Sequence, residues 1–385
     1  MSDLALAASP RRRNLSRAAV IATAAIFGLT YGLSAPLVAV NMAQRGDSEW
    51  LIGLNAAMHA VGVLLIAPVL PRLAVRFGTR RLMVAALAAS ALIFALFPLV
   101  PGIGWWFPLR LGLGVSAETL FVLSETWTND LSDEQSRGRM MAIYTAMLSL
   151  GFAGGPAILS LLGSGGIAYY FGSVIVLLAI LPVAGPWVLA PAALHPATAK
   201  MHQYLRLAPI AIGTTVLNAA VETAGLSFIA LYAAGMGWSM ERGMQLVSTL
   251  MVGAILLQLP IGWLADRMDR KRLVWILTAL SALGALAWPW MLGTPWLAFA
   301  LVFVWGGLFV GIYTVMLSVV GSRFRGGDLV GIYAVMGLAW GGGALIGPSL
   351  VGAAMQFSPT YGLPYAVAAG CALFAVFMAV RRSEA

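Results

Sequence analysis

The feature that most constrains this chain is a series of twelve apolar runs, each long enough to cross a bilayer as a helix of roughly 20 residues. The runs lie near residues 17–42, 50–74, 80–101, 104–129, 139–163, 167–190, 207–234, 241–265, 272–292, 295–320, 328–355 and 361–381. Only 10% of the residues are charged, against roughly a quarter in soluble domains. The two-residue alternation of a membrane β-barrel is absent, so we predict an all-α membrane protein with twelve transmembrane helices.

The basic residues indicate how these helices are oriented. With the N-terminus in the cytoplasm, 20 of the 23 Lys and Arg residues fall in the tails and cytoplasmic loops. Only Arg45 and Arg242 fall in external loops, and Arg110 lies within a run. Positive charge concentrates on the cytoplasmic side of membrane proteins. The net charge of +9 therefore reports topology and not a nucleic-acid partner, and we predict a multi-pass protein with both termini in the cytoplasm.

The second half of the chain repeats the first at an offset of about 190 residues, as expected for a transporter built from repeats. The segment from Arg76 to Leu82 matches that from Arg267 to Leu273, and Ile143-Tyr144 matches Ile332-Tyr333. We therefore predict two pseudo-symmetric six-helix bundles, at 14–190 and 207–385, joined by a short cytoplasmic linker at 191–206. The solute site is expected at the interface of the repeats, near mid-membrane.

Three motifs resemble those of the major facilitator superfamily. Gly262-Trp263-Leu264-Ala265-Asp266-Arg267-Met268-Asp269-Arg270-Lys271-Arg272 resembles its loop signature G-x-x-x-D-R-x-G-x-[RK]-[RK]. In the first-half copy Pro71 replaces the Gly and Val75 the Asp, whereas Arg76, Gly78, Arg80 and Arg81 remain. Gly151-Phe152-Ala153-Gly154-Gly155-Pro156 resembles the G-x-x-x-G-P motif of its proton-coupled antiporters. Arg110, followed by Gly112 and Gly114, resembles its R-x-x-x-G motif.

The resemblance implies a twelve-helix bacterial inner-membrane transporter, similar to the drug-antiporter-like members. It also implies that the residues of the loop signature gate the cytoplasmic side: Gly262, Asp266, Arg267, Arg270, Lys271, Arg272, Arg76, Gly78, Arg80 and Arg81. The simpler interpretation is that the basic residues supply only positive-inside charge. Because Val75 replaces the acid, we expect the second half alone to form this latch.

Ionisable residues within the spans are the strongest candidates for proton coupling: His59, Arg110, Glu118 and Glu222. A charge at the bilayer centre costs roughly 2.5–3.5 kcal/mol on insertion scales, so it persists mainly where it faces a cavity or a partner. We expect Glu222 to carry the exchanged proton, with Glu118 as a second carrier. Arg110 stays charged and is expected to bind an anionic group or tune a carboxylate. Each of these residues has a structural alternative as an interhelical hydrogen-bond or ion-pair partner.

Polar and aromatic residues within the spans are candidates for the substrate cavity: Tyr31, Asn55, Asn218, Gln258, Trp305, Tyr313, Tyr333 and Trp340. Each of them could equally serve in packing or as an interfacial anchor. Trp105, Trp106, Trp288 and Trp296 stand at span ends and are interpreted as interfacial belt residues.

The functional prediction is a secondary transporter that works by alternating access, with proton-coupled export of an amphiphilic compound favoured. No G-x-x-x-x-G-K-[ST] and no His-Glu-x-x-His occurs, so neither ATP hydrolysis nor enzyme activity is expected, and no cofactor or metal. The expected partners are a small-molecule substrate, protons and the lipid bilayer, with the protein acting as a monomer. Two alternatives stay open: a proton-coupled importer of an anionic or zwitterionic metabolite, and a membrane sensor that does not transport.

Overall fold

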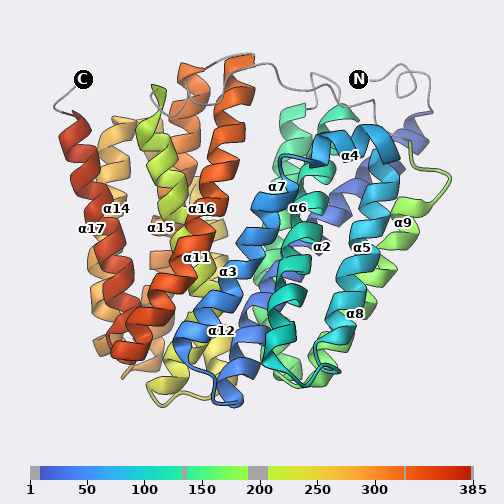
Figure 1. Cartoon of the computed structure of the whole chain (residues 1–385). Coiled ribbons are helices and arrows are strands. Elements are labelled where there is room, and N and C mark those ends of the chain that lie inside the picture. Colours follow the sequence, from blue (N-terminus) through green and yellow to red (C-terminus); the bar gives the residue numbers. More distant parts are fainter. Residues whose placement is uncertain (1–8, 132–136, 190–206, 325–326, 383–385) are drawn as a thin grey trace. The chain divides into compact units, whose positions relative to one another are not determined.

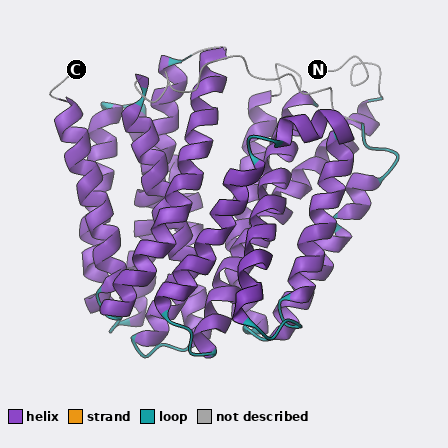
Figure 2. Ribbon diagram, viewed as in Figure 1, coloured by secondary structure: helices purple, strands orange, loops and turns teal. Residues whose placement is uncertain are grey.

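The computed structural model describes residues 9–131, 137–189, 207–324 and 327–382, and every regular element in those ranges is an α-helix (Figure 2). The helices, most of which are labelled in Figure 1, are α2 (Pro10–Gln44), α3 (Glu49–Ile66), α4 (Leu70–Phe77), α5 (Thr79–Leu96), α6 (Ile103–Asp130), α7 (Arg137–Leu162), α8 (Gly166–Leu178), α9 (Ile180–Ala184), α11 (Pro209–Gly235), α12 (Met240–Leu256), α13 (Gln258–Ala265), α14 (Arg270–Met291), α15 (Pro295–Arg323), α16 (Gly327–Phe357) and α17 (Gly362–Arg382). Twelve helical stretches in the described ranges are long and apolar enough to cross a membrane. The predicted fold class is confirmed.

Three of the predicted spans are interrupted where the sequence suggested one helix, and one of them, 167–190, divides into α8 and α9 at Ala179. The run 50–74 divides into α3, which ends at Ile66, and α4, which begins at Leu70. Pro68 stands between them; it has no N–H to donate and disfavours helical geometry at the residue before it, so the helix stops there. The run 241–265 likewise divides into α12 and α13 at Leu257.

The join between α4 and α5 depends on a glycine of the degraded loop signature. Gly78 has φ of +83°, in the left-handed region, and its N–H donates to the Ala74 carbonyl as the cap of α4. A side chain at this position would strain the backbone, because only glycine adopts positive φ at little cost. Gly78 therefore has a role in the turn itself, whatever its part in gating.

The described residues form two compact units, one made of 9–41 and 58–189 and the other of 42–57 and 207–382. The predicted linker, 191–206, lies outside the described residues. In the first unit α5 packs against α6 and α8, and its buried side chains join a core that includes Leu87, Leu123 and Trp127. The end of α2 and the start of α3 group with the second unit.

Each unit contains a close helix contact made by a Gly-Pro pair. In the first unit, a Cβ on Gly155 of α7 would lie 2.2 Å from the Gly32 carbonyl carbon of α2. In the second unit, a Cβ on Gly347 of α16 would lie 2.1 Å from the Ala220 carbonyl oxygen of α11. Small residues allow helices in a membrane to approach this closely. The duplication seen in the sequence thus recurs in the packing inside each unit.

Candidate functional site

Glu222 lies at the middle of α11 and lines a small cavity inside the second unit. Its carboxylate oxygen Oε2 accepts a hydrogen bond of 3.1 Å from the Asn218 side-chain amide, one helical turn earlier. The cavity measures about 20 Å³, room for one or two waters rather than for an organic molecule. No basic residue among those described pairs with Glu222. The carboxylate therefore has a neutral partner and no counter-ion within its unit.

Aromatic side chains form one wall of this cavity. Trp305 stacks on Phe309 with ring centroids 5.0 Å apart and an interplanar angle of 1°. Trp288 meets Trp305 edge to face, with centroids 4.9 Å apart, and the Trp305 indole N–H donates to the Ser281 carbonyl at 2.8 Å. Aromatic faces beside a carboxylate suit an organic cation, which gains from both the π-system and the negative charge.

The structure corrects the interpretation of two tryptophans as belt residues. Trp288 is 4% exposed and lines the Glu222 cavity, and Trp106 is 1% exposed, packed against Phe97 and Tyr169. Trp105 and Trp296 are 67% and 70% exposed, as belt residues would be. The sequence predicted the same belt position for all four tryptophans because all four stand at span ends. Which way each side chain points depends on the rotation of its helix, and a run of apolar residues does not define that rotation.

Of the cavity residues predicted in the second half, four do not line this cavity: Gln258, Tyr313, Tyr333 and Trp340. The Gln258 amide donates to the Ala254 carbonyl of its own helical stretch at 2.6 Å, and Tyr333 is 41% exposed. Tyr313 and Trp340 are partly buried and lie outside the lining. Trp305 lines the cavity, and Asn218 reaches it through its bond to Glu222.

A second polar centre lies in the first unit, around Arg110 of α6. The Arg110 side chain is 1% exposed, and its Nη1 donates to the Ser34 hydroxyl of α2 at 2.9 Å. Its Nε has no hydrogen-bond partner among the described residues, and no acidic side chain there pairs with it. His59 of α3 lies within electrostatic range and meets the Tyr31 ring edge to face at 4.6 Å. A buried cation with a hydroxyl partner can receive an anionic group.

Asn55 and His59 occupy one face of α3, a turn apart. Asn55 is fully buried, and neither atom of its side-chain amide has a hydrogen-bond partner in the described part of the chain. The same holds for His59 Nδ1. Buried polar atoms are usually satisfied, so unpaired ones are candidates for binding water or a ligand. Tyr31, His59 and Arg110 thus belong to one polar region of the first unit, whereas Asn55 groups with the second unit.

Glu118 and Glu125 form a third centre on α6, with Tyr144 of α7. The two carboxylates are close enough to interact electrostatically with each other and with Tyr144. The Tyr144 hydroxyl lies 3.0 Å from the Ser124 hydroxyl and donates to the Phe121 carbonyl at 3.3 Å. The seven-residue spacing of Glu118 and Glu125 places both on one helical face, but nothing local marks Tyr144, since its partners come from another helix.

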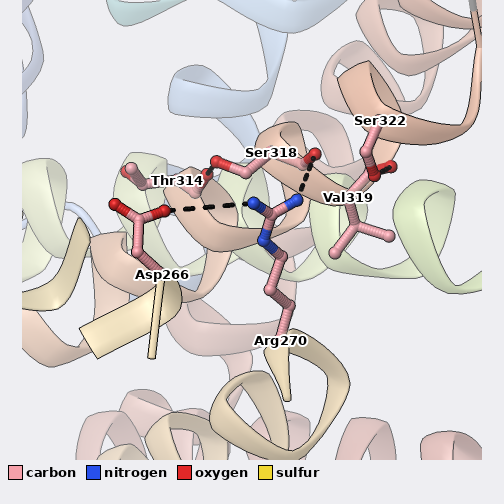
Figure 3. Close-up of polar contacts among 6 residues, drawn as sticks. All are labelled: Asp266, Arg270, Thr314, Ser318, Val319 and Ser322. Carbon is pink, nitrogen blue, oxygen red and sulfur yellow. Dashed lines mark hydrogen bonds and ion pairs between the residues drawn. The ribbon is translucent and has the colours of Figure 1, made fainter. Parts of the chain in front are cut away.

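The second-half loop signature is held to α15 through Arg270 (Figure 3). Its guanidinium donates to the Ser318 carbonyl at 3.2 Å and approaches the Asp266 carboxylate at 3.9 Å. Arg267 lies over the Trp263 ring at 3.7 Å, and Asp269 caps α14 by accepting from the Arg272 N–H at 2.7 Å. All these contacts stay within the second unit. In the first-half copy, Arg80 donates to the Val188 carbonyl and Arg76 lies over the Phe77 ring.

The antiporter-like motif serves helix packing in this structure. A Cβ on Gly151 would lie 2.2 Å from the Ala25 carbonyl oxygen of α2, and Gly155 approaches the same helix near Gly32. Pro156 follows within α7. Across the described ranges, no group of three or more His, Cys, Asp or Glu residues is arranged to hold a metal ion.

Comparison with known proteins agrees with this architecture. The sequence profile of the Major Facilitator Superfamily matches residues 20–348 and 210–385. An uncharacterised superfamily-type transporter of Bacillus subtilis, YfkF, is 27% identical over 287 residues, or 70% of this chain and 72% of that protein. The class C tetracycline resistance protein of Escherichia coli is 29% identical over 112 residues, 29% of this chain and 28% of that protein.

Among solved structures, the nucleoside transporter NupG superposes with a TM-score of 0.77 at 12% identity, covering 96% of this chain and 98% of that one. The family profile spans most of the sequence and the twelve apolar helices match its architecture. This chain belongs to the Major Facilitator Superfamily.

Proposed function

We propose that this transporter is proton-coupled and exports amphiphilic compounds that carry a positive charge. The observation that carries the proposal is the Glu222 carboxylate, which lines a cavity with Trp288, Trp305 and Phe309 and has no basic partner among the described residues. Membership of the superfamily makes the chain a membrane transporter and not an enzyme. The coupling ion, the substrate class and the direction are our proposals.

The chemistry is a competition for one carboxylate. Inside a membrane a carboxylate can be neutralised by binding a proton or by pairing with a cation, and it cannot do both at once. The aromatic wall adds affinity for an organic cation through its π-faces. Entry of a proton from one side then releases the cation, and release of the proton on the other side readies the site for the next cation. The cavity is too small for a substrate as it stands, so helix movement must open it.

Export is supported by two resemblances. The relative that matches over 112 residues is named for resistance to tetracycline, an antibiotic, and resistance suits outward transport. The segment from Gly151 to Pro156 resembles a motif of proton-coupled antiporters.

The orientation that we propose places the protein in a bacterial inner membrane with its basic loops in the cytoplasm. It is tested by replacing Cys371, introducing single cysteines in the loops and labelling them from one side of the membrane.

The proposal is tested by flux into vesicles. A panel of aromatic cations, including tetraphenylphosphonium, is first screened by thermal shift, since a ligand at 100-fold its Kd stabilises by about 2.7 kcal/mol. The best binder is then offered to vesicles with an acidic lumen. We expect wild-type protein to accumulate it until a protonophore collapses the gradient, and Glu222→Gln to fall to the level of empty vesicles.

The matched control is Glu241→Gln, which removes the same charge from the exposed first turn of α12 and should keep wild-type flux. Gradient-driven accumulation by Glu222→Gln at the wild-type rate would remove Glu222 from the mechanism. If no cation binds or accumulates in wild-type protein, the proposal of cation export fails.

The second candidate is proton-coupled import of an anionic or zwitterionic metabolite. It is favoured by one observation, the buried Arg110 that has Ser34 and no acidic side chain as a partner among the described residues. Stabilisation by carboxylates or phosphates in the same thermal-shift panel, with none by the cations, would favour this candidate over the first.

A further inference from the structure

A further cavity lies at one end of the second unit, remote from Glu222 along the helices. It measures about 430 Å³ and is bounded by the start of α14 and the end of α17, with Ile210 of α11 beside them. Lys271 and Arg272 line its polar side, and Trp275, Ile276, Met378 and Ala379 line its apolar side. In Figure 1 the ends of α14 and α17 lie side by side where the chain approaches its C-terminus. The cavity therefore has two cationic side chains on one side and an apolar wall on the other.

The two cations of this cavity have no acceptor among the described residues. No carboxylate and no carbonyl of the described residues bonds to the side chains of Lys271 or Arg272. The acids of the same loop are engaged elsewhere, Asp266 with Arg270 and Asp269 with the Arg272 backbone N–H. Trp275 is 43% exposed at this end of a membrane-spanning helix, where amphipathic tryptophan rings meet lipid head groups.

In the first unit, backbone carbonyls occupy the place that corresponds to this cavity of the second unit. Arg76 aligns with Arg267, an offset of 191 residues, which pairs Arg80 with Lys271 and Val188 with Ala379. Arg80 donates to the Val188 carbonyl, and Arg12 donates to the Pro186 and Trp187 carbonyls at 3.1 Å each. These carbonyls are available because the helix before them, α9, ends at Ala184.

In the second unit, no carbonyl of the described residues bonds to Lys271. There α17 stays helical through Arg382, so the Met378 carbonyl accepts a hydrogen bond of the helix itself, and the Ala379 carbonyl belongs to the last turn of the helix. Lys271, the cation equivalent to Arg80, lines the cavity and bonds to no acceptor among the described residues, whereas Arg80 bonds to a backbone oxygen.

We propose that this cavity binds an anionic phospholipid, with its phosphate on Lys271 and Arg272 and an acyl chain against Trp275, Ile276 and Met378. A phosphate oxygen replaces the backbone carbonyl that Arg80 binds in the first unit and adds a negative charge to the bond. Basic pockets between transmembrane helices bind anionic head groups in this way. The polar and apolar sides of the cavity match the two ends of a lipid and suit a soluble phosphate less well.

The test is a titration of delipidated, full-length protein in detergent with phosphatidylglycerol, read by native mass spectrometry, with phosphatidylcholine as the uncharged reference. We expect saturable binding of phosphatidylglycerol to one tight site. The double variant Lys271→Gln with Arg272→Gln should bind it about thirtyfold more weakly, because each basic residue in contact with the bound head group contributes about a fivefold gain. Ala379→Trp should also lose tight binding, since it fills the cavity and leaves the charge unchanged.

The matched control is Arg72→Gln with Arg76→Gln, which removes two exposed charges of the first-half loop and should bind the lipid within about twofold of wild type. Equal loss in both double variants would mean diffuse charge attraction and would overturn the proposal, as would unchanged binding in Ala379→Trp. Glycerol 3-phosphate at the same concentration should not displace the lipid. If it does, the site binds a soluble phosphate and the lipid assignment is wrong.

Discussion

Arg110 in the first unit and Glu222 in the second offer a direct comparison of how each half holds a charge within a span. The Arg110 side chain is 1% exposed and donates to a hydroxyl, whereas Glu222 is partly exposed to a small cavity and accepts from an amide. In the described residues of its own unit, neither has a partner of opposite charge. Each half thus maintains one ionisable group with only a neutral partner, and the two groups differ in sign.

The difference lies in what can neutralise each group. A carboxylate can take up a proton, but a guanidinium keeps its charge at any pH that a protein meets. Glu222 is therefore suited to exchange a proton for a cation, and Arg110 to hold a fixed positive charge beside His59 and Tyr31. A charge at mid-membrane costs roughly 2.5–3.5 kcal/mol, so neither group is expected to persist without a function.

The largest effect is expected from Arg110→Met. We expect transport to fall to the background of empty vesicles, because the fixed charge of the first unit is lost. The free energy of unfolding should be unchanged or raised by about 1–4 kcal/mol, since an apolar side chain replaces a buried charge that lacks a counter-ion. Flux assays and denaturant or thermal unfolding in detergent measure the two effects. A marked fall in stability with normal transport would show that Arg110 is structural, and the comparison with Glu222 would not hold.

A smaller effect, on stability, is expected from Ser34→Ala. This change removes the hydroxyl that accepts from Arg110 Nη1, and a hydrogen bond to a charged group contributes about 1.5–3 kcal/mol. Thermal unfolding should report a loss of that size. Ser90→Ala is the matched control, because the Ser90 hydroxyl is equally buried and has no hydrogen-bond partner among the described residues. Equal stability of the two variants would mean that the bond to Ser34 does not hold Arg110.

The smallest effect is expected from Trp305→Leu in the Glu222 cavity. Loss of one aromatic face should weaken binding of an aromatic cation roughly 2- to 30-fold, the range for about 0.5–2 kcal/mol of cation–π energy. Isothermal titration of the folded, monodisperse variant measures this change. Trp296→Leu alters a tryptophan that is 70% exposed and outside the cavity, so its affinity should match wild type. Equal affinity in both variants would show that the aromatic wall does not contribute to cation binding.

Much of the architecture was predictable because apolar length is a local property. The twelve spans and the repeat between halves followed from runs of residues and matched heptapeptides such as that from Arg76 to Leu82. The breaks after Ile66 and at Leu257 were missed, although Pro68 signals the first of them. A hydropathy run averages over one or two turns and does not register a three-residue interruption.

The candidate sites were predictable only in part. Glu222, Asn218 and Trp305 were identified, since an ionisable or polar residue in a span is unusual at any rotation of its helix. Trp288 was assigned to the membrane belt and Phe309 was not considered, because an aromatic residue in an apolar run has no local mark of what it faces. Lys271 and Arg272 were identified as loop cations, but their cavity depends on the end of α17.

The sequence by itself determined that this chain crosses the membrane twelve times, repeats one six-helix plan and carries ionisable groups at mid-depth, because each of these is a matter of residue type and spacing. The tertiary structure decided which aromatic rings surround Glu222, that Arg110 meets Ser34, and that Arg80 binds a carbonyl whereas Lys271 has no such partner among the described residues. Those outcomes depend on the rotation and the ends of helices far apart in the chain. Packing between helices sets both, and no single apolar run contains that information.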